Sequence, residues 1–369
     1  MVNYFVFLTI STGIFAIFAL GLNIQWGYTG LINFGHVAFM TIGAYTTILL
    51  SMQGVPLLIA VIAGSLLAIV LGLLVGFSTL RLREDYLAIV TIGVSELLRL
   101  IAQNEEWLTQ GTFGLQNYPL PLGEFNPNWL SKGIMIAILS AIALFAVWQL
   151  KQGIQGEFQT RKQRQKIARF PLDLGIWGIL AIILGGIIYF NGVIALVNYT
   201  YKAGLMLLIL VTLTILYAIV QRLGQSPWGR VLKAIREDEQ VPRALGKDIF
   251  WYKLQAFMFG GAIAGIAGAF YAWQLTTIYP NNFEPLISFY AWTIVVLGGA
   301  GNNAGILLGA VIFWTYNSVT RFVLPNFDWI DDARLGAFRL LVIGLILMIL
   351  MIFRPQGILG KKEELTLGR

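Results

Sequence analysis

Apolar blocks of about twenty residues recur along this chain and constrain its fold more than any other feature. A bilayer core about 30 Å thick needs about 20 mostly apolar residues per crossing helix. We count eleven blocks. They are Tyr4–Leu22, Leu31–Leu50, Pro56–Thr79, Tyr86–Ala102, Gly133–Leu150, Leu174–Phe190, Ala203–Val220, Leu254–Trp273, Ile287–Leu297, Ala304–Thr320 and Leu340–Phe353. The block from Ile287 is short, so we expect it to extend into its flanks or to form a half-helix that ends at the following glycines.

The composition supports the same class of protein. Hydrophobic residues make up 57% of the chain and charged residues 12%, and a soluble surface needs about twice that charged fraction. A cytosolic enzyme, a nucleic-acid binder and a disordered chain are therefore disfavoured. We predict an all-α integral membrane protein, a polytopic bundle of 10 or 11 spans that forms one transmembrane domain over residues 1–369.

The distribution of Lys and Arg predicts the orientation in the membrane. Nineteen of the 25 fall into alternate loops and the C-terminal tail, whereas five fall into the opposite loops. Basic residues mark cytoplasmic loops, so we expect the N-terminus outside and the C-terminus in the cytoplasm. The basic loop Lys151–Arg169 is a topology determinant in this scheme, with anionic-lipid contact as the alternative. Residues 103–132 form an external loop, and residues 221–253 form a cytoplasmic segment.

Conventional catalytic residues are scarce. The chain has no cysteine and a single histidine, His36, which disfavours thiolate and histidine metal sites. Its closest string to a phosphate-binding loop, Gly246-Lys247, continues with Asp248 and lacks the upstream glycine and the hydroxyl that would hold Mg²⁺. We therefore expect no cofactor on this chain, and any ATP and Mg²⁺ to be bound by partner subunits.

Two polar features interrupt the apolar spans. Glu96 and Arg99 are oppositely charged and three residues apart on one helix. They form either a structural lock between helices or a polar constriction on a substrate route, because charges within membranes tend to be functional. His36 lies early in the second span. A hydrogen-bonded packing role is favoured there over proton transfer, because no carboxylate lies within a helical turn.

Glycines provide a third feature. Three pairs are spaced four apart on helical blocks, which places each pair on one face and predicts close helix packing: Gly72 and Gly76, Gly261 and Gly265, Gly305 and Gly309. The string LGGAGNNAG, Leu297–Gly305, instead predicts a helix break. A place on the substrate pathway and an ordinary tight turn both remain open for it.

The cytoplasmic segment holds an apolar stripe. It comprises Val231, Leu232, Ile235, Val241, Ala244 and Leu245. Pro242 suits the first turn of a second helix that Gly246 can end. We predict two short amphipathic helices that dock in a partner's groove, in preference to a solvated loop, because exposed apolar stripes need cover.

Five strings in order resemble the branched-chain amino-acid permease family of ABC importers, in particular the larger of its two membrane subunits. They are GYTGLINFGHVAFMTIGAY (27–45), LTQGTFGL (108–115), AIREDEQVPRALG with YKLQAFMFGGAIAGIAGAFYA (234–246 and 252–272), IVVLGGAGNNAG (294–305) and FRPQGIL (353–359). Asn33 stands where the family usually has serine, and Val241-Pro242 and Asn302-Asn303 also depart from its pattern. The chain has three crossings where the family has one, which predicts an added helical hairpin at residues 133–190.

The resemblance implies roles for particular residues. The coupling helix that sits in a cleft of the ATPase would use Arg236, Glu237, Asp238, Glu239, Arg243, Ala244, Leu245 and Gly246. The translocation pathway would involve Asn33, His36, Phe39, Glu96, Arg99, Thr109, Gly111, Gly114, Gly298, Gly299 and Gly301. The segment from Thr109 to Gly114 would face the delivered substrate or its binding protein.

The resemblance also implies the surroundings of the chain. These are the bacterial inner membrane with its lipid, a second related permease subunit, two ATPase subunits and an external binding protein that delivers neutral or branched-chain amino acids. A urea-type importer is the neighbouring alternative, although its first motif lacks the Gly35-His36 dipeptide. An ion-coupled carrier working alone and an intramembrane enzyme are the alternatives from other classes. The carrier is disfavoured because Glu96 is the single carboxylate within a span, and no nucleophile or metal constellation supports the enzyme.

Overall fold

The computed structural model describes residues 2–81, 84–165, 172–323, 332–353 and 356–360. Regular structure in these ranges is helical, apart from one isolated bridge between Leu115 and Ile278. Seven of the basic residues that served to predict the membrane orientation lie outside the described residues. They are Arg83, Lys166, Arg169, Arg354, Lys361, Lys362 and Arg369.

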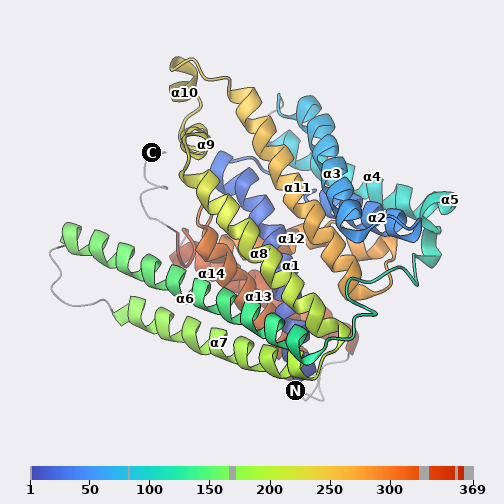
Figure 1. The fold of residues 1–369 in the computed structure, drawn as a ribbon. Helices are drawn as coiled ribbons and strands as arrows, with labels where there is room; N and C mark the ends of the chain where they lie inside the picture. The colour runs from blue at the N-terminus through green and yellow to red at the C-terminus, as the bar shows by residue number, and fades with distance from the viewer. Residues whose placement is uncertain (1, 82–83, 166–171, 324–331, 354–355, 361–369) are drawn as a thin grey trace. The chain divides into compact units, whose positions relative to one another are not determined.

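The chain groups into two compact units. The first contains residues 1–10 and 122–214, and the second contains residues 11–121 and 215–369. Helices of the first unit are α6 (Trp129–Gln165), α7 (Leu172–Val197), the start of α1 (Val2–Leu22) and the first part of α8 (Tyr201–Gln225). Helices α6 and α7 run side by side (Figure 1), where Ser140 and Tyr189 hydrogen bond at 2.9 Å. They occupy the residues of the predicted hairpin.

The second unit contains the remaining helices and the ends of α1 and α8. In chain order they are the π-helical turn η1 (Asn23–Tyr28), α2 (Val37–Met52), α3 (Leu57–Thr79), α4 (Glu84–Asn104), α5 (Glu106–Thr109), η2 (Gly111–Phe113), α9 (Pro227–Glu237), α10 (Gln240–Ala244), α11 (Ile249–Leu275), η3 (Pro280–Phe283), α12 (Leu286–Gly298), α13 (Asn303–Val323) and α14 (Asp332–Phe353).

Every predicted apolar block coincides with a helix. Within the described ranges, six helices are long and apolar enough to cross a membrane, or seven if α12 and α13, bent by 118°, count as one broken span. The short block from Ile287 is the predicted half-helix, because α12 ends at Gly298. Two boundaries were wrong. The second helix begins at Val37 and not at Leu31, and α6 continues past Leu150 to Gln165, so most of the predicted loop Lys151–Arg169 is helical. The residues just before Val37 form a turn. In this turn Gly35 lies so close to α4 that a Cβ on it would collide with the backbone of Thr91.

Close backbone packing holds the second unit together. Helix α11 packs on α2 and α3, and a Cβ at Gly43 of α2 would collide with the backbone of Gly265 of α11. A Cβ at Gly72 would lie 3.1 Å from the Cα of Met258. Lipid tails are as apolar as a helix interface, so burial of apolar side chains does not drive helix association in a membrane. Close van der Waals packing does, and small residues allow the backbones to approach for it. The predicted packing role of the four-spaced glycines is confirmed.

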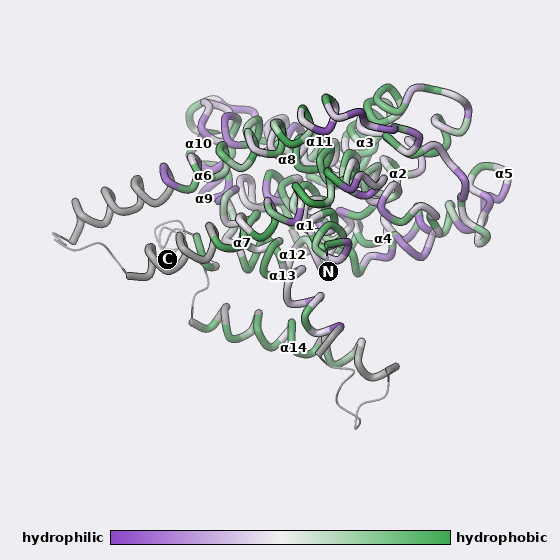
Figure 2. Tube along the Cα trace, turned by 60° about the horizontal axis from the view of Figure 1, so that its bottom comes forward, coloured by the Kyte–Doolittle hydropathy of each residue, from purple (hydrophilic) through white to green (hydrophobic). Residues whose placement is uncertain are grey.

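Helix α11 also separates two polar regions. Its first residue follows α10, and after its last turn Ile278 pairs with Leu115 of the loop that carries α5 and η2. Because α11 has 27 residues, these regions lie about 40 Å apart at 1.5 Å per residue. Figure 2 shows polar residues gathered around α5 and α10, with apolar residues along the helices between them.

Candidate coupling and translocation site

The predicted pair of short helices is present as α9 and α10. Ser226 caps α9, its hydroxyl accepting the Gly229 N–H at 3.3 Å, and Pro227 occupies the first turn. Both residues are well suited to begin a helix. After α10, Gly246 adopts a φ of +73° and ends the segment.

The apolar stripe divides between two environments. Leu232 and Ile235 of α9 are buried within the chain. Val241 of α10 is 53% exposed, and Leu245, directly after α10, is 74% exposed. Within the chain, α9 is therefore held by buried apolar side chains, whereas the apolar side chains of the α10 region are exposed.

The predicted coupling residues also fall into two groups, those that are exposed and those that are bonded within the chain. Glu237, Asp238, Arg243, Ala244 and Gly246 are exposed with Leu245. Glu239 forms an ion pair with Lys253. Arg236 turns inward, where Nη1 donates to the carbonyl oxygen of Gly27. Only the exposed residues are placed to meet a partner directly.

The glycine break is a pair of half-helices packed on each other. Gly299 and Gly301, with φ of +104° and +82°, turn the chain between α12 and α13. A Cβ at Gly298 would collide with the backbone of Gly305. The C-terminal segment closes the end of α12, because Ile358 N–H donates to the Leu297 carbonyl at 2.9 Å.

Amide side chains surround this break. Asn23 Nδ2 donates to Asn303 Oδ1 at 2.9 Å, and Asn23 Oδ1 accepts the Gly301 N–H at 2.8 Å. Asn303 Nδ2 donates to Gln221 Oε1 at 2.9 Å. Sequence reasoning missed Asn23, Gln25 and Gln221. The available signal was the presence of Asn23 and Gln25 directly after an apolar span, where buried polar groups need hydrogen-bond partners.

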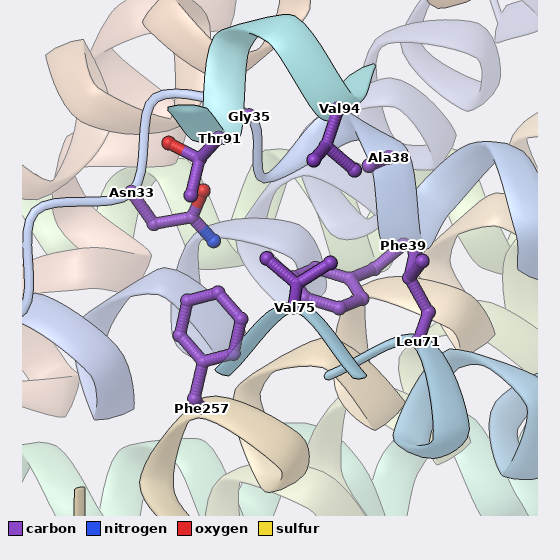
Figure 3. A pocket seen from close by; sticks show the side chains of 9 residues that line it. All are labelled: Asn33, Gly35, Ala38, Phe39, Leu71, Val75, Thr91, Val94 and Phe257. Carbon is purple, nitrogen blue, oxygen red and sulfur yellow. The ribbon is translucent and has the colours of Figure 1, made fainter. Parts of the chain in front are cut away.

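A small pocket lies between the loop before α2 and helices α2, α3, α4 and α11 (Figure 3). Its lining brings together the predicted residues Asn33 and Phe39 with Thr91 and several apolar side chains. Asn33 is fully buried, its Nδ2 donates to Gln25 Oε1 at 2.8 Å, and its Oδ1 has no partner among the described residues. Figure 3 shows the Asn33 amide pointing from the loop toward the pocket centre.

His36 lies beside this loop but faces α1. Its ring stacks on Phe18 with a centroid distance of 4.7 Å, and Nε2 lies 3.1 Å from the Phe18 carbonyl oxygen. The ring is fully buried and does not line the pocket of Asn33 and Phe39. These contacts are those of a packing histidine.

Glu96 and Arg99 are bonded to each other. Arg99 Nη2 and Nε donate to the two Glu96 carboxylate oxygens at 2.6 and 3.0 Å. Nη1 also donates to Gln103 Oε1 at 3.0 Å and to Asn281 Oδ1 at 2.9 Å. The pair lies near the α5 end of α4, and Asn281 belongs to η3, so Arg99 ties these two elements together.

The predicted external segment packs on the end of α11. Thr109 Oγ1 donates to the Ala102 carbonyl at 2.6 Å. Gly111 and Gly114 have φ of +58° and +71°, and a Cβ at Gly114 would collide with Ile278. Thr109, Gly111 and Gly114 therefore set the conformation of the loop through its backbone. The side chain of Phe113, between the two glycines, is 75% exposed.

The predicted pathway residues thus fall into three places. Asn33 and Phe39 share the pocket, with His36 beside it. Gly298, Gly299 and Gly301 form the break. Glu96, Arg99, Thr109, Gly111 and Gly114 lie at the α5 end of the unit.

Long apolar helices, among them the bent pair α12 and α13, indicate a multi-pass membrane protein. A family model described as branched-chain amino acid transport system / permease component matches residues 4–351. The chain therefore belongs to this family, and the predicted resemblance is confirmed.

Individual relatives of the chain support the same family. The chain is 30% identical over 349 residues to the high-affinity branched-chain amino acid transport system permease protein LivM of Escherichia coli, covering 94% of this chain and 68% of the relative. It is 24% identical to a probable LivM of Methanocaldococcus jannaschii, covering 96% and 92%. It is also 24% identical to LivH of Salmonella typhimurium, covering 95% and 92%. No solved structure matches the chain.

Proposed function

We propose that this chain is a membrane subunit of an ATP-driven importer of neutral and branched-chain amino acids in the bacterial inner membrane. Separate ATPase subunits bind ATP and Mg²⁺, an external binding protein delivers the solute, and a second related permease completes the pathway. The N-terminus lies outside, the C-terminus lies in the cytoplasm, and ten or eleven spans cross the bilayer. Family membership and the names of the relatives support the amino-acid class of solute.

The uncovered face of α10 is the observation that carries this proposal. Val241 and Leu245 are exposed next to Glu237, Asp238 and Arg243. An apolar helical face with charges beside it fits a groove on a partner. It lies at the opposite end of α11 from the loop that would receive the solute. An ATPase that moves α10 could switch the spans as rigid bodies between two arrangements.

Purification of the intact complex and reconstitution in vesicles test this proposal. We expect ATPase polypeptides and a second permease to copurify, and branched-chain amino acid uptake to require ATP on the cytoplasmic side. Mass spectrometry identifies the chains, and labelled leucine measures uptake. Uptake that persists without ATP and follows an imposed ion or pH gradient would support the carrier alternative and contradict the proposal.

Substitution of Glu96 by alanine distinguishes the two interpretations of the ion pair. An unpaired charge within a span costs about 2.5–3.5 kcal/mol on insertion scales, and less near its end. We expect Glu96→Ala to lower uptake or assembly several-fold, whereas Glu124→Ala in the exposed loop has little effect. If the pair is a structural lock, the double variant Glu96→Ala/Arg99→Ala restores both uptake and assembly. If the pair belongs to the substrate pathway, the double variant restores assembly but not uptake. Equal effects of Glu96→Ala and Glu124→Ala would exclude both roles.

A further inference from the structure

The π-helical turn η1 contacts the coupling segment directly. Arg236 of α9 donates from Nη1 to the Gly27 carbonyl. Lys233, one turn earlier on α9, places Nζ 5.3 Å from the centre of the Tyr28 ring. Gly30, just after η1, lies against Arg236, since a Cβ at Gly30 would be 4.0 Å from the Arg236 Cβ. Two cationic side chains of α9 thus rest on one short turn.

The same turn, η1, also contacts the glycine break. Asn23 is fully buried, and its amide bonds both to Asn303 and to the Gly301 N–H. Gly27 touches the same place, because a Cβ on it would lie 2.6 Å from Gly301 N. The turn is therefore packed on the break without an intervening side-chain layer.

The same turn reaches the pocket and α11. Gln25 Nε2 donates to the Phe257 carbonyl at 2.9 Å, and Gln25 Oε1 accepts from Asn33 Nδ2 at 2.8 Å. Phe257 and Asn33 both line the pocket (Figure 3). A shift of η1 would therefore change the pocket wall together with the break.

Physical chemistry makes η1 suited to transmit movement. Single π-helical turns occur frequently at functional sites. Buried amides that lose their partners in a membrane interior are costly, so Asn23 and Gln25 tend to move with the groups that they bind. A second connection runs beside it, since Gln221 of α8 bonds to Asn303 just before α9 begins.

We propose that η1 is the relay through which α9 and α10 move the glycine break and the pocket, with Arg236 and Asn23 as its positioning residues. The proposal rests on the proposed function, because it assumes that an ATPase moves α10. It assigns Arg236 to transmission inside the permease and not to the docking surface.

The first test substitutes Arg236 by alanine in the intact complex in vesicles. We expect the amount of leucine imported per ATP hydrolysed to fall about tenfold, within the range for residues that couple two sites. ATPase copurification should stay unchanged. Arg230→Ala is the matched control, because Arg230 lies on the same helix and bonds to the Gln225 carbonyl at 3.0 Å. Loss of the ATPase from Arg236→Ala, or an unchanged import ratio, would overturn the relay.

The second test restores the link covalently. A Cβ separation of 4.0 Å between Gly30 and Arg236 suits a disulfide, and the chain has no other cysteine. Gly30→Cys/Arg236→Cys should be uncoupled when reduced and should recover ATP-driven uptake when oxidised. Gly30→Cys alone controls for side-chain strain, since Gly30 has a φ of +78°. Failure of the disulfide to form, or no recovery on oxidation, would overturn the proposal.

The two hypotheses fail differently. If the wild-type complex imports leucine without ATP, the proposed function is wrong whatever the variants do. If the wild-type complex and Arg230→Ala require ATP but Arg236→Ala keeps the wild-type import ratio, the proposed function stands and the relay is wrong.

Discussion

Replacing Val241 and Leu245 by aspartate is expected to abolish ATP-driven uptake while the chain still inserts into the membrane. Both side chains, one on α10 and one directly after it, are more than half exposed, so the substitutions disturb no internal packing. Anchor residues at an interface each contribute about 2 kcal/mol or more. Loss of two such anchors weakens docking about a thousandfold.

Copurification of the ATPase subunits and ATP-dependent leucine uptake measure this effect. Met52→Asp is the matched control, because Met52 is 42% exposed at the end of α2, outside the coupling segment. We expect that variant to keep its ATPase subunits. Full ATPase binding by Val241→Asp/Leu245→Asp would show that α10 is not the docking element.

Two glycine-to-alanine substitutions are expected to change stability in opposite directions. A Cβ at Gly309 of α13 would collide with the backbone of Ile294 in α12, whereas a Cβ at Gly93 of α4 meets nothing within 4 Å. Overpacking costs about 1–3 kcal/mol. Alanine in an open helical position gains about 0.5–1 kcal/mol over glycine.

Thermal unfolding of the purified protein in detergent, followed by tryptophan fluorescence, measures both shifts. Gly309→Ala should unfold at a lower temperature than the wild type, and Gly93→Ala at the same or a higher temperature. Shifts of equal sign and size would contradict the close packing of α12 on α13.

The helices themselves could be predicted because each needs only local information. Apolar length alone located a helix at every predicted block. The apolar stripe, Pro242 and Gly246 predicted the two short helices after α8. The glycine string predicted the break at Gly298, because consecutive glycines do not favour helix. The start of α2 was placed six residues early, since its boundary depends on how closely Gly35 approaches α4.

The partners of polar side chains could not be predicted, because hydrogen bonds join segments far apart in the chain. Nothing in the stretch around Asn23 indicates that its amide meets Asn303, 280 positions later. Arg236 was assigned to the docking surface with its neighbours, yet its guanidinium turns inward to Gly27. The adjacent side chain, Glu237, is exposed, so a single position along the chain separates an inward-facing side chain from an exposed one.

The sequence by itself determined the class of protein, the places where helices run and the family, because apolar length, glycine spacing and ordered strings are properties of the linear chain. Tertiary structure alone decided which polar groups meet. Leu232 is covered whereas Leu245 is uncovered, although both belong to one apolar stripe. The physical reason is that burial and hydrogen bonding depend on distances in space, and these are fixed only when the helices pack.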